Sequence, residues 1–140
     1  MNDEFFQEVL KDFDIKERDI DALPPLVLAF IGDAVYDVYV RTLLISKGGK
    51  NVHSLHIDSI NYVKAGSQSD ILKKLAPVLT DEETEIVRRG RNSNPSTVPK
   101  HADVTEYRYA TGFEALLGHL YLTKKFERLL VILRMAVNNE

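Results

Sequence analysis

Two carboxylates occupy strongly apolar surroundings in this 140-residue sequence. Asp33 lies inside the apolar segment 26–41, and Glu114 lies inside the segment 107–122. A carboxylate taken out of water without compensation costs several kcal/mol, so each acid must be protonated, paired with a base or bound to a cation. Small residues stand one helical turn from Glu114 and would leave room for a ligand to reach it; these are Ala110, Thr111 and Gly118.

Two interpretations of these acids compete. In the first, the acids form internal ion pairs with bases close to them in sequence. The candidate pairs are Asp33 or Asp37 with Arg41, and Glu114 with Arg108 or Lys124. In the second, Asp33 and Glu114 face each other across a gap between two helices and share a hard cation. Magnesium prefers oxygen ligands, keeps several waters and commonly uses one or two carboxylates. Neither acid has a histidine on its own helix face, which disfavours zinc.

Both acids belong to segments with helical periodicity, and no hairpin signal is present, so the expected class is all-α. The expected helices are Glu4–Phe13, Pro25–Ser46, Ser54–Ala76, a segment from the N-cap Thr80 to Arg89, Val104–Thr123 and Lys125–Asn138. A possible weakening is expected at Gly66. A polar stretch to Leu23 and a loop from Arg91 to Asp103 are expected to lack regular structure.

The apolar residues of segment 26–41 cover nearly every direction of a helical wheel, which predicts a helix packed on most sides. The exception is a stripe of three charged residues spaced four apart, Asp33, Asp37 and Arg41. Gly32 precedes the first of them. A glycine inside a helix costs about 1 kcal/mol relative to alanine, so we expect a close helix approach at this position.

Length and composition bound the class of protein. One hundred and forty residues with 44% apolar content predict a single domain, 1–140, with a real core. The absence of cysteine excludes disulfides, thiolate metal sites and a cysteine nucleophile. No signal segment is expected, and the charges within segment 22–45 argue against a membrane span. We therefore expect a soluble, cytoplasmic protein.

The net charge of −3 conceals an uneven distribution. Residues 1–21 hold eight acids and three bases, whereas Ile86–His101 holds four bases and no acid. The long loop that follows Arg91 is unusual for a compact domain, and such loops are often functional.

The motif Phe30-Ile31-Gly32-Asp33-Ala34-Val35, together with Glu114-Ala115-Leu116-Leu117-Gly118, resembles the two signature helices of the ribonuclease III catalytic domain. The resemblance is closest to the short bacterial branch, mini-ribonuclease III, which lacks a separate RNA-binding domain. The stretches 88–92 and 107–109 resemble that branch specifically, and the resemblance covers essentially the whole chain. It implies a ribonuclease III-like endonuclease domain, a helical bundle that is dimeric.

Carried over by position, Asp33 and Glu114 match the family's essential magnesium-binding acids, so both are catalytic and metal-ligand candidates. The full-length enzymes have two further acids, one turn before each of these, where this chain has Ala29 and Thr111. Their first signature glutamate falls at Leu26. The mini branch shares these losses, which leave a second protein-held metal in doubt. Manganese is a possible substitute for magnesium.

The resemblance implies a magnesium-dependent endoribonuclease that cleaves double-stranded RNA and leaves 5′-phosphate and 3′-hydroxyl ends. Each subunit of a homodimer would cut one strand. The family's assignment for the mini branch is maturation of the 23S ribosomal RNA precursor, and a ribosomal protein is a candidate helper. Duplex RNA is recognised through phosphates and 2′-hydroxyls, which require cations and polar groups. The candidates are Arg88, Arg89, Arg91, Lys100, His101, Arg108 and Lys64.

Two other functions remain open on the residues alone. The first is a noncatalytic RNA-binding or ribosome-associated module that keeps the fold but cannot cleave with only two site acids. The second is a helical dimerisation domain with internal ion pairs and no role with RNA. The basic residues near Arg88 could also be a solvated helix end, where cations are favoured anyway.

Overall fold

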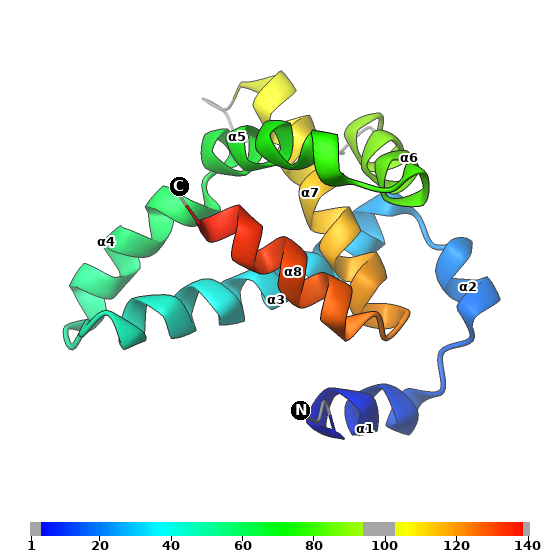
Figure 1. Cartoon of the computed structure of the whole chain (residues 1–140), viewed down its shortest axis with the longest axis horizontal. Helices are drawn as coiled ribbons and strands as arrows, with labels where there is room; N and C mark the ends of the chain where they lie inside the picture. Colours follow the sequence, from blue (N-terminus) through cyan, green and yellow to red (C-terminus); the bar gives the residue numbers. More distant parts are fainter. Residues whose placement is uncertain (1–3, 94–102, 139–140) are drawn as a thin grey trace.

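A computed structural model of the chain describes residues 4–93 and 103–138, and every regular element within those ranges is helical (Figure 1). The elements are α1 Glu4–Phe13, α2 Glu17–Asp21, α3 Pro25–Ser46, α4 Val52–Val63, α5 Ala65–Leu75, the short 3-10 helix η1 Ala76–Val78, α6 Asp81–Arg91, α7 Val104–Leu122 and α8 Phe126–Val137. The expectation of an all-α fold is confirmed.

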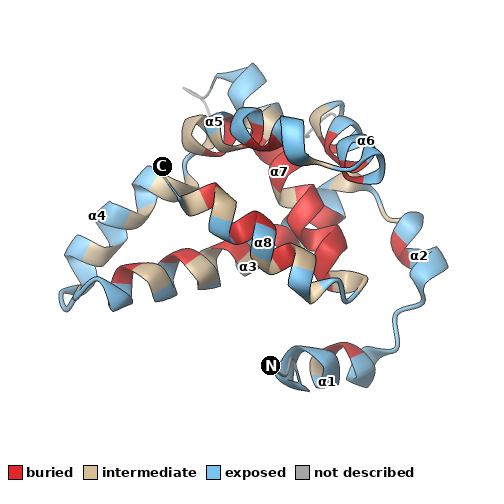
Figure 2. Cartoon of the chain, viewed as in Figure 1, coloured by how far each residue is buried: buried red, intermediate tan, exposed pale blue. Residues whose placement is uncertain are grey.

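Helix α7 is the centre of the molecule, and α3, α5, α6 and α8 all pack against it (Figure 1). Its contact with α3 is the most extensive between any two elements. From Ala110 to Tyr121 every residue of α7 is buried except Glu114, which is partly exposed. Figure 2 shows α7 as the most buried helix of the molecule. The one ionisable acid of this segment therefore lies where the core opens.

Two glycines set the close approach of α3 and α7. A Cβ placed on Gly32 would overlap the backbone carbonyl oxygen of Glu114, and one placed on Gly118 would overlap the backbone carbonyl oxygen of Leu28. Each glycine thus allows main chain to touch main chain. Because Asp33 follows Gly32 and the overlap is with Glu114 itself, this contact brings both acids to the same place.

The expected helix Ser54–Ala76 is wrong in one respect, because the chain breaks into α4 and α5 at Lys64 and not at Gly66. Lys64 adopts an extended backbone conformation, with ψ of 152°. Two buried side chains satisfy the carbonyl groups that the break releases. The Tyr36 hydroxyl donates to the Tyr62 carbonyl oxygen at 3.1 Å, and Gln68 Nε2 donates to the Val63 carbonyl oxygen at 3.0 Å. The break therefore leaves neither carbonyl unsatisfied.

Two other boundaries differ from expectation. The polar stretch before Leu23 contains the short helix α2, which has too few residues to show a helical pattern in the sequence. Its Ile20 is only 2% exposed, so this one apolar side chain packs α2 against the rest of the molecule. Helix α6 continues to Arg91, two residues beyond its expected end. Most of the expected loop, residues 94–102, lies outside the described residues.

The expectation that α3 is packed on most sides is also wrong. A stripe along the helix is exposed, with Val27, Phe30, Val38 and Ile45 as its large apolar members, and Phe30 is 81% exposed. We call these four residues the α3 stripe. A helical wheel shows which faces of a helix are apolar. It does not show whether an apolar face packs within the same chain or is exposed and available to another molecule. A search of the described helices for one long and apolar enough to cross a membrane finds none.

Candidate active site

The carboxyl groups of Asp33 on α3 and Glu114 on α7 lie within hydrogen-bonding reach of each other, beside the contact at Gly32. Burial, followed by the hydrogen bond and the negative charge of Asp33, raises the pKa of Glu114 to about 9. Asp33 is exposed to solvent, whereas Glu114 is largely surrounded by the core. Glu114 therefore keeps its proton at neutral pH when no cation is bound.

Gln68 on α5 is the third member of this cluster. Its Nε2 donates to Glu114 Oε2 at 3.3 Å as well as to the Val63 carbonyl oxygen, and the side chain is buried. Donation to the carboxylate opposes the effects of burial and of Asp33 on the Glu114 pKa, but it is the weaker influence. Gln68 was not predicted as a site residue, because its role depends on a contact between residues 46 positions apart.

The ion-pair interpretation holds for one acid only. Arg41 Nη2 lies 3.9 Å from Asp37 Oδ2, an exposed pair of the kind that contributes little stability. Burial, and then the nearby charge of Asp33, raises the pKa of Asp37 despite this base. Among the ion pairs of the described residues none joins Glu114 to Arg108 or Lys124, so that alternative is wrong for Glu114.

Glu114 opens into a pocket of about 440 Å³ between α5 and the first half of α7. Ala110 and Thr111 line it one turn before the acid, together with Gly66 of α5. Ala110 and Thr111 leave space beside the carboxyl group, as their spacing predicts. The same expectation is wrong for Gly118, because this glycine packs against the main chain of Leu28 and does not line the pocket. A hydrated ion and part of a polar substrate can therefore reach Glu114 from this side.

The donor set suits a hard divalent cation that keeps most of its water. In the part of the chain that the structure describes, no group of three or more His, Cys, Asp or Glu side chains could hold a metal ion. What the site offers is oxygen only, from two adjoining carboxyl groups without a basic partner. Two carboxylates with water in the remaining positions is a usual arrangement for magnesium and an unusual one for zinc.

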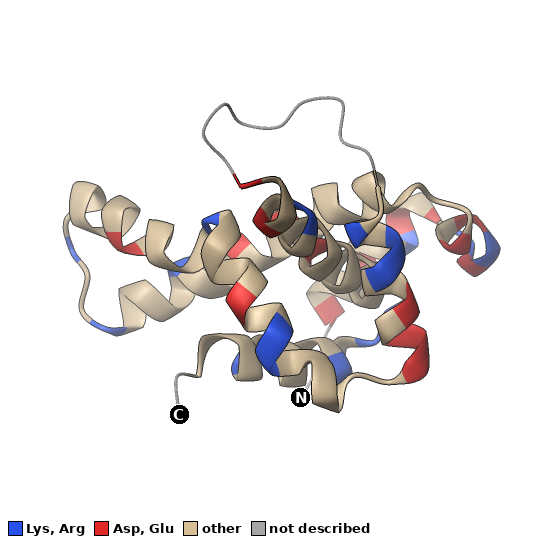
Figure 3. Cartoon of the chain, turned by 90° about the horizontal axis from the view of Figure 1, so that it is seen from above, with Lys and Arg blue, Asp and Glu red and all other residues tan. Residues whose placement is uncertain are grey.

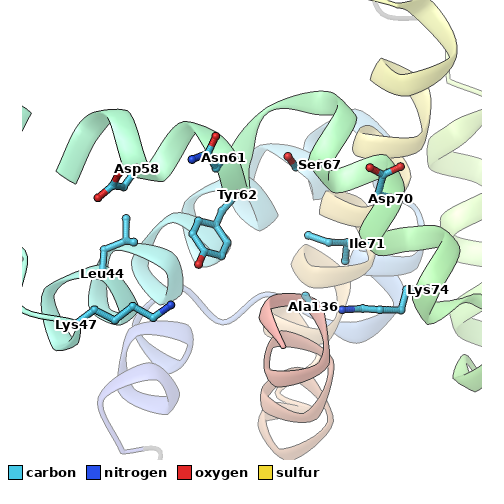
Figure 4. A pocket seen from close by; sticks show the side chains of 10 residues that line it. All are labelled: Leu44, Lys47, Asp58, Asn61, Tyr62, Ser67, Asp70, Ile71, Lys74 and Ala136. Carbon is cyan, nitrogen blue, oxygen red and sulfur yellow. The ribbon is translucent and has the colours of Figure 1, made fainter. Parts of the chain in front are cut away.

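A second pocket, of about 550 Å³, lies between α4, α5, the end of α3 and the end of α8 (Figure 4). Its lining includes two lysines and two aspartates, Lys47, Lys74, Asp58 and Asp70, but neither acid of the pair described above. Figure 4 shows the aspartates attached to α4 and α5 and separated along them, so they do not form a second carboxylate pair. The larger pocket is therefore not the centre of the candidate site.

The predicted RNA-binding residues have different environments. Helix α6 runs from an acidic start to a basic end, where Arg88, Arg89 and Arg91 lie (Figure 3). The Arg88 guanidinium makes two hydrogen bonds to Glu85, at 2.6 and 2.8 Å, while Arg91 lies over the ring of Tyr109 at 5.2 Å.

The remaining candidates are not gathered into one described cluster. Arg89 and Arg108 are exposed, and Lys64 is exposed at the break between α4 and α5. Lys100 and His101 lie outside the described residues. Lys73 of α5 also lies over Tyr109, at 5.7 Å, and was not among the predicted residues because only the packing of α5 on α7 brings it there.

Comparison with known proteins decides the family. The model of the ribonuclease III domain matches residues 26–125, a range that contains both acids and the pocket. The chain belongs to the ribonuclease III domain family. It is 53% identical to the mini-ribonuclease 3 of Thermoanaerobacter sp. strain X514 over 116 residues, and this alignment covers 83% of this chain and 82% of that relative. It is 47% identical to the mini-ribonuclease 3 of Symbiobacterium thermophilum, over 83% of this chain and 89% of the relative.

A solved structure has the same fold. A crystal structure of a Fusobacterium nucleatum protein aligns with a TM-score of 0.76 and 34% sequence identity, over 85% of this chain and 95% of the other. The resemblance to mini-ribonuclease III is thus confirmed, and an endoribonuclease of the ribonuclease III type is the activity that the family supports. Members of the family act on double-stranded RNA and generally use a divalent metal.

Proposed function

We propose that this chain is a single-domain, magnesium-dependent endoribonuclease that cleaves double-stranded RNA and leaves 5′-phosphate and 3′-hydroxyl ends. The observation that carries the proposal is Glu114, a largely buried acid with a pKa of about 9 that faces Asp33 and has no basic partner among the described residues. A structural ion pair would have lowered this pKa. Perturbed acids in a pocket are typical of functional sites.

Asp33 and Glu114 are the residues that would hold the ion. When bound, Mg²⁺ supplies Lewis acidity toward a phosphodiester and a water of lowered pKa. Glu114 must lose its proton for this, because a carboxyl group ligates as the carboxylate. Asp33 is exposed to solvent, whereas Gln68 donates to Oε2 of the largely buried Glu114. Manganese meets the same ligand preference and is a possible substitute.

The RNA surface would include Arg88, Arg89, Arg91, Arg108 and Lys64, with Lys100 and His101 as candidates that lie outside the described residues. The exposed α3 stripe supports a homodimer, because solvent-facing apolar surface of this kind marks an interface. The proposed biological substrate is a stem of the 23S ribosomal RNA precursor in the cytoplasm, with a ribosomal protein as a possible helper. This part of the proposal rests on the similarity to mini-ribonuclease III.

The test is an assay on duplex RNA with Mg²⁺, with EDTA, and with Asp33→Asn. We expect cutting in Mg²⁺ only, and a loss of roughly 10²–10³-fold in the variant, as for other groups that stabilise developing charge. Duplex binding by the variant in EDTA should equal that of the wild type. A wild type that binds duplex RNA but does not cut it in Mg²⁺ or Mn²⁺ would favour the noncatalytic module, and one that does neither would favour a dimerisation domain.

A further inference from the structure

The side-chain amide of Gln68 connects the break between α4 and α5 with the candidate catalytic acid. Its Nε2 makes two hydrogen bonds, to the Val63 carbonyl oxygen at 3.0 Å and to Glu114 Oε2 at 3.3 Å. The Val63 carbonyl oxygen can only accept a hydrogen bond. The opposite amide orientation would place Gln68 Oε1 against this oxygen and repel it, so the Val63 carbonyl determines that Nε2 is the end that faces Val63 and Glu114.

The burial of this amide shows that it is not an incidental surface contact. Gln68 is 2% exposed, and its Oε1 has no hydrogen-bond partner among the described residues. A buried polar atom without a partner carries a free-energy cost that an apolar side chain of similar size would avoid. A group that keeps this cost needs a role that an apolar side chain cannot fill, and the two hydrogen bonds of Nε2 provide one.

The position of Gln68 also connects two parts of the proposed site. The break at Lys64 begins α5, and Gln68 lies one turn later, so its bond to Val63 holds the end of α4 against the start of α5. Its second bond reaches across to α7. One side-chain amide therefore holds both the Glu114 carboxyl group and the backbone beside Lys64, a proposed RNA contact.

We propose that Gln68 is a positioning residue that orients the Glu114 carboxylate for a divalent cation. This rests on the proposed function, since it concerns the same site. Residues that hydrogen-bond to a metal ligand fix its orientation, and their loss typically weakens metal affinity or activity about 10–100-fold. Gln68 does not touch the RNA in this proposal and takes no part in bond breaking.

The experiment compares Gln68→Met with Tyr36→Phe. Gln68→Met keeps the volume and removes both hydrogen bonds. Tyr36→Phe removes the other buried hydrogen bond at the same break, from Tyr36 to the Tyr62 carbonyl oxygen, and leaves the bond to Glu114 in place. Circular dichroism establishes the melting temperature of each protein. Calorimetry with Mg²⁺ alone measures metal affinity, and duplex RNA binding in EDTA measures affinity without metal.

We expect Gln68→Met to weaken Mg²⁺ binding by about 10–100-fold while duplex RNA affinity in EDTA changes less than about twofold. Tyr36→Phe should lower the melting temperature but keep wild-type Mg²⁺ affinity. Equal loss of Mg²⁺ affinity in both variants would overturn the proposal, because the break and not the amide would then control the site. Unchanged Mg²⁺ affinity in Gln68→Met would overturn it as well.

A measurement on the wild type covers the case in which Gln68→Met does not fold. The side-chain amide resonances of Gln68 should shift during a Mg²⁺ titration, while those of the exposed Gln7 on α1 stay in place. Absence of a Gln68 shift at saturating Mg²⁺ overturns the proposal. A wild type that neither binds Mg²⁺ nor cuts duplex RNA instead refutes the proposed function itself, before any variant is considered.

Discussion

Glu114 holds its proton far more tightly than an ordinary carboxyl group, because burial and Asp33 both disfavour its charge. The pKa of about 9 in the folded chain compares with an ordinary value of 4.5. Between these two values the folded chain binds a proton that the unfolded chain has released. The free energy of unfolding therefore falls as pH rises through this window.

This difference predicts the stability of the metal-free protein. In EDTA, we expect the melting temperature to fall by more than about 4 °C between about pH 5 and about pH 9, on the scale usual for chains of this size. Glu114→Gln has no carboxyl group to titrate and should lose most of this dependence. A scan of melting temperature against pH by circular dichroism measures both, and an equally steep slope in the variant would show that other groups cause it.

The basic residues of α6 differ in how free they are to meet a phosphate. Arg88 is already bonded to Glu85, whereas Arg89 is exposed and has no ion-pair partner among the described residues. A phosphate contact by Arg88 would have to replace that carboxylate. Arg89 is therefore the better candidate for a contact that releases counterions.

We expect Arg89→Ala to weaken duplex RNA binding and to reduce the slope of log affinity against log salt concentration by about 1. Lys11→Ala is the matched control, since it removes an exposed cation from α1, away from the candidate site, and should leave the slope unchanged. Binding measured by fluorescence anisotropy at several salt concentrations gives the slope. An unaltered slope for Arg89→Ala would remove this residue from the RNA surface.

At the scale of the elements, the contact of α3 with α7 was the most predictable part of the fold. Gly32 in one apolar segment predicted a close helix approach. The meeting of Asp33 and Glu114 was one of two interpretations of the acids, beside internal ion pairs. The break at Lys64 could not be predicted in the same way. Its stabilising hydrogen bonds come from Tyr36 and Gln68, and only the folded packing brings those side chains to the freed carbonyl groups.

Helix α2 was missed for a related reason. Its five residues are too few to display a period, and it is docked by Ile20. The exposure of the α3 stripe was missed because a helical wheel reports apolarity but not what covers it. Local pattern thus predicted α1, α3, α6, α7 and α8, while tertiary contacts determined the short helix α2 and the break between α4 and α5.

The glycine contact predicts a large energetic effect from one methyl group. The Cβ of Gly32→Ala would overlap main-chain atoms of α7, and these atoms can move away only if the whole helix shifts. We expect the substitution to lower the free energy of unfolding by about 2–3 kcal/mol. Gly66→Ala is the control, because its Cβ would meet only the flexible side chain of Glu106, at 3.2 Å. Urea denaturation measures both variants, and a Gly32→Ala protein as stable as the control would contradict the close contact.

At the scale of the whole molecule, the α3 stripe and Asp33 share one helix. Val27, Phe30, Val38 and Ile45 are exposed on α3, and Asp33 lies among them in sequence. If this face forms the proposed homodimer, the candidate site of each chain lies close to the interface. Activity should then depend on protein concentration.

We expect Phe30→Glu to shift the protein toward monomer, because a charge placed in an apolar interface must be desolvated. Sedimentation velocity at several concentrations measures the change. Phe5→Glu on α1 is the control, since Phe5 is also exposed, at 72%, but lies outside the stripe. A Phe30→Glu protein that sediments as the wild type does would rule out this face as the interface.

At Gly32 the main chain of α3 is in van der Waals contact with the main chain of α7 at Glu114, so the two helices cannot approach more closely there. This lower limit on the distance between Asp33 and Glu114 comes from backbone atoms, which are the same for every residue type, and not from the shapes of the surrounding core side chains. We therefore expect random repacking of the apolar interior, with both glycines and Gln68 spared, to lower the melting temperature gradually while the surviving variants keep native ion affinity. Core substitutions that accumulate during evolution would thus change the thermal stability of this chain more than its affinity for the ion.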